Sequence, residues 1–402
     1  MRLVNKKAMA LAVFALFGSG ASLAQSTGTS KLELWGVVDA AVRHTSNEGP
    51  TRSGKTQMLG GGMSQSRWGI NVEEDLGGGS KALVLLENRF DADMGTPAAN
   101  SPYFQLAYVG LQGPYGRLTA GRQWNVLFDV VTSTYASFPY SPYMEAYKPE
   151  LGMAMGARNS NMLKYMFATP DRSWVGALQY SFDENNKFGY AGFPGAPAQI
   201  PAYVASTLNG GAWKTAGGYL RYSAAGAAVG GGYLRTTLPG GTNVDAWTLG
   251  GSYRTGPWYL AAGYGLNKAK FAAVTSPVMG LRNAVDGVIL GQSWGGQTSG
   301  GFQPGDADKR QLFKLGVGYQ MTTQLNLGVH YFRGKQSGSV SGLSNGNADF
   351  LVAVADYAFS KRTDAYFGVD YTRISGGSAI VLDTASNARN RTGITLGLRH
   401  RF

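Results

Sequence analysis

The last twelve residues, Arg391–Phe402, alternate between apolar and polar side chains. Ile394, Leu396 and Leu398 fall on one side of an extended chain, and Arg399 falls on the other. A period of two is typical of a β-strand with one apolar side and one water-facing side. Because the polar side carries arginine and the chain ends on an aromatic residue, we expect the apolar side to meet lipid. A strand of about 9–11 residues can cross a bilayer, so this segment predicts one strand of a transmembrane sheet.

The same pattern recurs along the chain. In the segment 311–321, Phe313 and Leu315 fall on one side of the extended chain and Lys314 falls on the other. The predicted strands number sixteen and cover 32–45, 66–74, 81–90, 103–111, 117–122, 159–168, 174–182, 214–223, 227–237, 244–254, 258–267, 311–321, 325–334, 349–359, 364–374 and 392–402. Tight turns alternate with long connections, as in outer-membrane barrels, and an even strand count places both chain ends on the periplasmic side. We therefore predict an all-β fold, a 16-stranded antiparallel transmembrane β-barrel with a water-filled lumen.

Composition agrees with this interpretation. The chain has 402 residues, 59 of them glycine, 12% aromatic residues and a mean hydropathy of −0.15, which is too polar for helical membrane spans. Cysteine is absent, which excludes disulfide frameworks and cysteine-based metal or nucleophile sites. The net charge of +12 predicts a preference for small anions or contact with lipopolysaccharide phosphates. A generally solvated basic surface is the alternative, and nucleic acid is not expected as a partner of an exported chain.

The N-terminus is typical of an export signal. Arg2, Lys6 and Lys7 precede the apolar run Ala8–Phe17, and small residues around Ala24 form a cleavage site. We expect residues 1–24 to be removed and residues 25–402 to form the barrel; a short buried helix is the alternative. No other segment has the 18 or so consecutive apolar residues of a transmembrane helix.

The connection 123–157 differs from the others because it is unusually apolar. It contains Trp124, Leu127, Phe128 and Phe138, whereas surface loops are mostly polar. A loop with its own apolar content packs against something, and in a wide barrel the free surface is the inner wall. We therefore expect this third outer loop to fold inward and narrow the pore. A position on the rim or at a subunit contact is the alternative.

Taken in order, several motifs resemble the general diffusion porins of the Gram-negative outer membrane, of the kind common in β-proteobacteria. The motifs are Leu34–Asp39, Ser66–Gly69, Glu74–Gly79, Tyr108–Leu111, Gly121–Gln123, Arg158–Asn161 and Gly397–Phe402. The resemblance covers the whole mature chain. It implies a homotrimer in the outer membrane, in which small hydrophilic solutes and ions diffuse through each barrel past an inward third loop.

The resemblance also implies an arginine ladder on the wall facing the third loop, with Arg67 and Arg158 in that role. The parity of the chain agrees, because Arg158 shares its side with Lys164. Gln105 stands where the family usually has a basic residue, which weakens the ladder. Opposed cations and acids would create a transverse field that disfavours apolar solutes. The residues predicted at the constriction are Arg67, Arg158, Lys164, Glu87, Gln105, Arg89, Asp129, Glu145 and Glu150.

Catalytic chemistry finds little support in the sequence. Two Gly-x-Ser-x-Gly matches, Gly291–Gly295 and Gly342–Gly346, lie in glycine-rich loops rather than on a strand-to-helix turn. The three histidines, His44, His330 and His400, are scattered along the chain. We expect no catalytic residue, no metal and no cofactor.

Two other functions stay open at this point. One is a substrate-selective channel or surface receptor whose long loops, 183–213 and 269–309, bind a ligand. The other is an outer-membrane enzyme, for which His44 alone is placed to serve at the outer rim. A passive channel with weak anion preference is the leading hypothesis.

Overall fold

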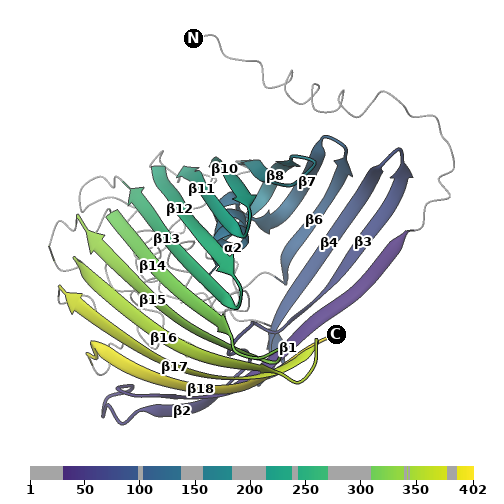
Figure 1. Cartoon of the computed structure of the whole chain (residues 1–402). Helices are drawn as coiled ribbons and strands as arrows, with labels where there is room; N and C mark the ends of the chain where they lie inside the picture. Colours follow the sequence, from purple (N-terminus) through teal and green to yellow (C-terminus); the bar gives the residue numbers. More distant parts are fainter. Residues whose placement is uncertain are drawn as a thin grey trace, which may run out of the picture.

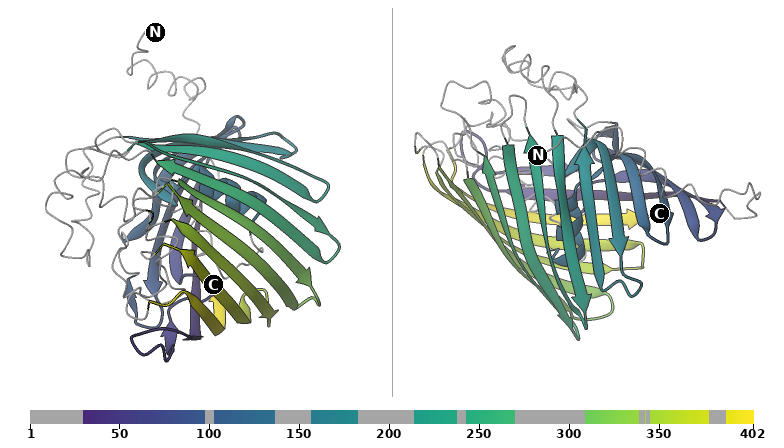
Figure 2. Two further views of the ribbon diagram at one scale, coloured as in Figure 1. Left: turned by 90° about the vertical axis from the view of Figure 1, so that its left-hand side faces the viewer. Right: turned by 90° about the horizontal axis from the view of Figure 1, so that it is seen from above.

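The computed structural model describes residues 30–97, 103–136, 157–182, 214–237, 243–269, 309–338, 342, 345–377 and 387–402. These residues form one antiparallel sheet that closes on itself as a barrel (Figures 1 and 2). The predicted signal segment, nearly all of the long loops 183–213 and 269–309, and the later part of the third connection lie outside the described residues. Among the described residues, no helix is long and apolar enough to cross a membrane.

Each of the sixteen predicted strands has a counterpart in the barrel, which confirms the fold class. The long strands are β1 (Lys31–Thr45), β3 (Arg67–Gly77), β4 (Ser80–Asp91), β6 (Phe104–Gly113), β7 (Gly116–Trp124), β8 (Arg158–Ala168), β9 (Trp174–Ser181), β10 (Lys214–Ala224), β11 (Ala227–Thr237), β12 (Asn243–Thr255), β13 (Trp258–Ala269), β14 (Lys309–Gln320), β15 (Leu325–Ser337), β16 (Gly346–Ala358), β17 (Thr363–Gly376) and β18 (Asn390–Arg401). Within the residues that the structure describes, the connections hold two short strands, β2 (Lys55–Leu59) and β5 (Thr96–Pro97), and one helix, α2 (Val126–Thr134).

The two ends of the chain close the barrel. On one edge, β1 pairs with β18, with Val42 opposite Leu396, and on its other edge it pairs with β3. Gly36 and Phe402 exchange two backbone hydrogen bonds of 3.0 Å at the seam. The C-terminal strand identified from the sequence is therefore the one that removes the free edge of the sheet.

The strands turn their apolar sides outward. Leu396 and Leu315 are 61% and 60% exposed, whereas Arg399 and Lys314 on the alternate positions are 3% and 4% exposed. This arrangement, apolar outside and charged inside, is the one expected of a barrel surrounded by lipid. The parity predicted for β14 and β18 is confirmed.

Aromatic side chains mark both ends of the outward surface. Trp258 and Tyr319 pack together with ring centroids 4.5 Å apart next to the short turns, and Tyr331 and Tyr371 lie toward the long connections. Such rows match the interfacial girdles of membrane barrels. Trp35 lies outside these rows, because it shares the inward face of β1 with Asp39.

A segment between β2 and β3 folds against the inner wall. Both strands pair with the same edge of β1, and residues 60–66 bridge the gap between them over Asp39. The Asp39 carboxylate, fully buried, accepts hydrogen bonds from the backbone N–H groups of Gly62 (3.1 Å), Met63 (3.0 Å) and Ser64 (2.6 Å), and from the Tyr366 hydroxyl (2.6 Å). One carboxylate thus holds this segment against β1 and β17.

We predict that Asp39→Asn destabilises the barrel by about 2 kcal/mol, since hydrogen bonds to a buried charged acceptor contribute most. The midpoint of thermal unfolding, followed by heat-dependent gel mobility in detergent, measures the effect. Glu33→Gln on the same strand is the matched control, because Glu33 is 48% exposed and its ion pair with Lys31 lies at the surface. Equal midpoints for the two variants would show that Asp39 does not hold the segment.

Candidate functional site

The site is the inner wall around α2, which follows β7 directly. Asn125 caps the helix, with its side chain accepting a hydrogen bond of 2.9 Å from the Phe128 N–H. The Val126 N–H donates to the side-chain oxygen of Gln179 on β9 at 2.7 Å. The Asn125 N–H donates to the Ala157 carbonyl at 2.9 Å, which ties together the two ends of the third connection.

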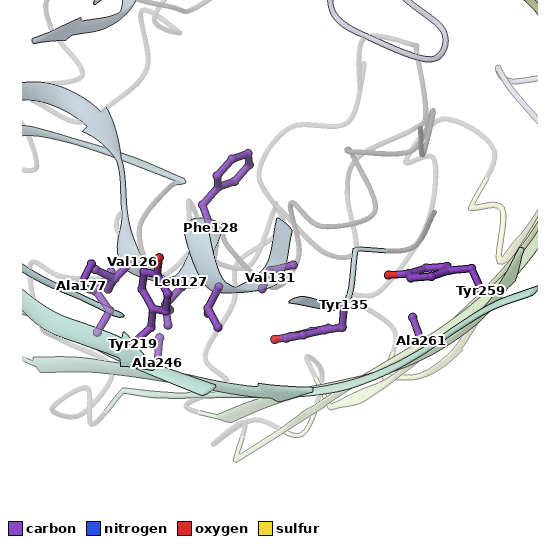
Figure 3. Close-up of a cluster of buried hydrophobic side chains, with 12 residues drawn as sticks. Val126, Leu127, Phe128, Val131, Tyr135, Ala177, Tyr219, Ala246, Tyr259 and Ala261 are labelled. Atoms are coloured by element: carbon purple, nitrogen blue, oxygen red, sulfur yellow. The ribbon is translucent and has the colours of Figure 1, made fainter. Parts of the chain in front are cut away.

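One face of α2 packs on inward-facing positions of the wall. The helix contacts β9, β10, β11 and β12 inside the barrel, and Figure 3 shows Leu127 and Tyr135 on the side of the strands while Phe128 points away. Glycines on the wall make room for this packing. A Cβ atom at Gly230 would lie 2.9 Å from side-chain atoms of α2, since the helix sits almost directly on the strand.

The C-terminal end of α2 is anchored on β12 and β13. The ring of Tyr135 lies over Gly250 and Gly263, and its hydroxyl is hydrogen bonded to that of Thr248. The Tyr259 hydroxyl donates to the Ala136 carbonyl at 2.7 Å. The described start of the third loop therefore lies within the lumen. The inward fold of the whole loop stays a prediction, because residues 137–156 lie outside the described residues.

Trp124, at the end of β7, joins the helix to the predicted cations. Its ring stacks on the Phe128 ring with centroids 3.7 Å apart. The guanidinium of Arg158, at the start of β8, lies 3.7 Å from the centroid of the Trp124 ring. The Lys164 Nζ atom donates to the Trp124 carbonyl at 2.9 Å and to the Asp129 carboxylate at 2.7 Å. One aromatic residue thus holds the helix and two cations in a fixed arrangement.

A second group of predicted residues adjoins Trp124 from β3 and β4. Glu87 pairs with Arg89 at 2.8 Å and with Arg67 at 3.9 Å, and Arg89 donates to the side-chain oxygen of Gln65 at 2.8 Å. The Arg89 guanidinium lies 5.3 Å from the Trp124 ring centroid. Six predicted residues, Arg67, Glu87, Arg89, Asp129, Arg158 and Lys164, are therefore linked through Trp124.

The position of the Arg158 side chain has a different cause from the one expected from the sequence. The pairing of β7 with β8 shifts register next to Gly121, and Asn161 adopts φ 52°. This irregularity interrupts the alternation that linked Arg158 to Lys164, so stacking on Trp124, not parity, sets the position of Arg158. Gln105 is buried beside a similar register shift between β4 and β6. Glu145 and Glu150 lie outside the described residues.

Sequence reasoning missed a second charged group on the opposite strands. Arg43 of β1 makes a two-pronged ion pair with Asp370 of β17 at 2.6 and 3.0 Å. Arg399 of β18 pairs with Asp364 at 2.8 Å and lies 3.7 Å from Asp356. The period-two pattern already puts Arg399 on a polar side, but the partners of both arginines are more than thirty residues away in sequence.

The electrostatics of the site follow from these pairs. Burial raises the pKa of the Asp129 carboxyl above its ordinary value, and the adjacent Lys164 ammonium opposes that shift. Asp129 should therefore take up a proton at a higher pH than an exposed aspartate does. The cation it neutralises would then carry an uncompensated charge beside the pore.

The described residues give no support to the enzyme hypothesis, which depends on His44. His44 lies at the end of β1 on the outward side, and its Nδ1 atom lies 2.9 Å from the Thr56 hydroxyl. Within the described ranges, no group of three or more histidine, aspartate or glutamate residues is placed to hold a metal ion.

A closed barrel with an apolar outside and a charged lumen defines the class of transmembrane β-barrel channels. The family described as Gram-negative porin matches residues 8–377, so the chain belongs to the Gram-negative porins. It is therefore a passive outer-membrane channel that crosses the bilayer with many strands.

Known relatives and solved structures agree. The chain is 31% identical to outer membrane porin protein 32 of Delftia acidovorans over 63% of its length and 67% of that protein. It is 26% identical to outer membrane protein S2 of Salmonella typhi over 92% of both chains. Its fold matches an anion-selective porin from Comamonas acidovorans with a TM-score of 0.66 and 21% identity, covering 93% of this chain and all of that one.

We predict that Gly250→Ala loosens the end of α2, because the added Cβ atom would lie 2.5 Å from ring atoms of Tyr135. Single-channel records should show more current noise and altered conductance. Gly231→Ala on the outward face of β11 is the control, since its nearest neighbour is 3.1 Å away and no part of α2 is among the neighbouring atoms. Identical single-channel records for both variants would mean that the packing of Tyr135 on Gly250 does not affect the conductance of the pore.

Proposed function

We propose that this porin is a general diffusion channel with weak anion preference, whose constriction lies between the third loop and the cations gathered around Trp124. The observation that carries the proposal is that α2 and two cations meet at Trp124. Phe128 and Arg158 stack on its ring, and Lys164 donates to its carbonyl and to Asp129 of α2. Fixed charges at a narrow point act on passing ions at short range. The predicted constriction residues Gln105, Glu145 and Glu150 belong to the same proposal.

The anion preference is supported by the balance of buried charge. The described residues with buried side chains include seven lysines and arginines and five aspartates and glutamates. Most of the cations are neutralised in pairs, so the surplus is small and the field favours anions only weakly. The anion selectivity named for the Comamonas porin of similar fold is in the same direction.

The assembly is part of the proposal. We infer a homotrimer of mature chains that begin at residue 25, in contact with outer-membrane lipid and lipopolysaccharide. OmpT of Vibrio cholerae, which shares this fold with a TM-score of 0.60, has been solved in a trimer form. Neither a cofactor nor an enzymatic activity enters this proposal.

The direct test is single-channel recording of the purified protein in a planar bilayer under a salt gradient. We expect ohmic current, insertions that close in three equal steps, and a reversal potential of the sign for weak anion preference. Flux that rises linearly with concentration for unrelated small solutes is expected as well. Saturable flux inhibited by one solute would favour the substrate-selective alternative, and folded protein without conductance would overturn the channel proposal.

We predict that replacing Arg67 and Arg158 together by glutamine shifts the reversal potential toward cation preference, because two positive charges leave the constriction. Asp129→Asn provides a control of opposite sign. It removes the partner of Lys164 and should shift the potential toward anions. An unchanged reversal potential in both variants would place these residues away from the path of the ions.

The pH dependence of the ion selectivity follows from the Asp129–Lys164 ion pair. Burial raises the pKa of Asp129, so this carboxylate should become protonated at a higher pH than an ordinary aspartate does. Protonation removes the charge that neutralises Lys164, and the preference for anions should therefore increase as the pH is lowered. The reversal potential as a function of pH measures this change. The Asp129→Asn variant should lack that part of the response, and a full response in the variant would contradict the assignment.

A further inference from the structure

The segment of residues 60–66 between β2 and β3, named here the inner segment, is neutral but lies among arginines. Its sequence, Gly-Gly-Gly-Met-Ser-Gln-Ser, contains no ionisable side chain. Arg89 of β4 donates to the Gln65 side-chain oxygen at 2.8 Å, and Arg67 of β3 donates to the Gln65 carbonyl at 3.3 Å. The two arginines share one carboxylate, that of Glu87. Gln65 therefore supplies the further acceptors without adding a negative charge.

The neighbouring residue, Ser64, joins the inner segment to the second charged group of the lumen. Arg399 of β18 donates to the Ser64 hydroxyl at 2.8 Å while it pairs with Asp364 of β17 at 2.8 Å. Two adjacent residues of the inner segment thus accept hydrogen bonds from arginines of three different strands. Such bonds to a guanidinium are strong and directional, so they fix its position.

The inner segment is itself held firmly against the wall. The Met63 side chain is 1% exposed and belongs to a cluster of buried apolar residues. A Cβ atom at Gly62 would lie 2.7 Å from the Cβ atom of Ala41, so a side chain at this position would collide with the wall. Together with the backbone hydrogen bonds to Asp39, this packing makes the inner segment a fixed support for Gln65.

The inner segment and α2 lie on opposite sides of the lumen. The helix packs mainly on β10 and β11, the eighth and ninth of the sixteen long strands around the barrel. The inner segment packs on β1, the first, and on β17, the fifteenth.

The two elements also lie at a similar depth. Tyr366, which accepts a hydrogen bond from the Met63 N–H at 2.9 Å, is the fourth residue of β17. Gly230, which lies beneath α2, is the fourth residue of β11. Both strands begin at a short turn. The inner segment and α2 therefore face each other across the pore.

We propose that the inner segment forms the second side of the constriction, opposite α2, and that Gln65 is a positioning residue for ion selectivity that acts through Arg89. The arginines line the wall between the two elements, with Trp124 at one end of the row and Gln65 at the other. This inference rests on the proposed channel function and names the residue that fixes one of its cations.

The role of Gln65 has a consequence for selectivity. Arg89 is 8% exposed, and loss of the Gln65 acceptor would leave one of its N–H groups without that partner. An unsatisfied buried donor is costly, so the guanidinium should turn toward the water of the lumen. There it would act more strongly on passing anions.

The first test is the reversal potential of the purified protein in a planar bilayer under a gradient of potassium chloride. Gln65→Met keeps the side-chain length and removes the acceptor, so the chloride-to-potassium permeability ratio should rise roughly twofold. Gln65→Glu keeps the acceptor and adds a negative charge, so the ratio should fall by a similar factor. The controls are Gln320→Met and Gln320→Glu, on the lumen side of β14 at its short-turn end; both should leave the ratio nearly unchanged.

A double-mutant cycle shows whether Gln65 acts through Arg89. In an Arg89→Gln background, Gln65→Met should not change the permeability ratio further, because the donor that it would release is absent. A full shift in that background would overturn the positioning role. A ratio for Gln65→Met equal to that of its Gln320 control would overturn it as well. Heat-dependent gel mobility in detergent shows whether the variants are folded.

Labelling at position 65 tests the placement of the inner segment. The chain contains no cysteine, so Gln65→Cys introduces a single thiol. A bulky cationic methanethiosulfonate reagent should lower the single-channel conductance of this variant by about half, because it would obstruct a narrow point. The same reagent on Gln320→Cys should lower the conductance much less. Complete labelling at position 65, verified by mass spectrometry, without a fall in conductance would overturn the placement.

Failure of this inference and failure of the proposed function give different results. An unchanged reversal potential after the joint replacement of Arg67 and Arg158 would contradict the proposed constriction as a whole. A shift in that variant, combined with Gln65 variants that behave as the Gln320 controls do, would overturn this inference alone.

Discussion

The constraint on which this structure depends is the lack of hydrogen-bonding partners in the hydrocarbon layer. Every backbone N–H and C=O group at membrane depth must be paired within the protein, so a sheet can cross the bilayer only if it has no free edge. The pairing of β1 with β18 meets that requirement between residues that are nearly the whole chain apart. Because closure is made by the last strand, the C-terminal segment completes the sheet that the other strands begin.

Closure also divides the side chains into two populations. Alternation sends apolar residues to the lipid and charged residues to the lumen, where pairs such as Arg43–Asp370 and Arg399–Asp364 offset one another at 2.6 and 2.8 Å. Against this polar wall, α2 packs an apolar face, and it can do so because Gly230 and Gly250 present almost no side chain. The helix therefore gains burial without displacing the charged residues beside it.

Period-two patterning made the strands predictable, because each strand carries its own alternation in a dozen residues. Parity puts Lys164 on a polar side of its strand, whereas the grouping of Arg67, Glu87 and Lys164 at one constriction follows from the resemblance to porins. Parity could not find the role of Trp124, since stacking on Phe128 depends on a helix of nine residues inside a long loop. Nor could it place Asp39, whose partners in the segment 60–66 and on β17 come together only when the barrel closes.

Strands β14–β17 carry two charge systems on opposite faces. On the inside, Lys314 lies 4.3 Å from the Tyr135 ring centroid, and Asp370 pairs with Arg43. On the outside, Arg333 and Arg373 flank a single aspartate at the outer end. Because adjacent residues point to opposite faces, a substitution at one of these positions changes the charge on one surface of the wall and leaves the side chains of the other surface as they are.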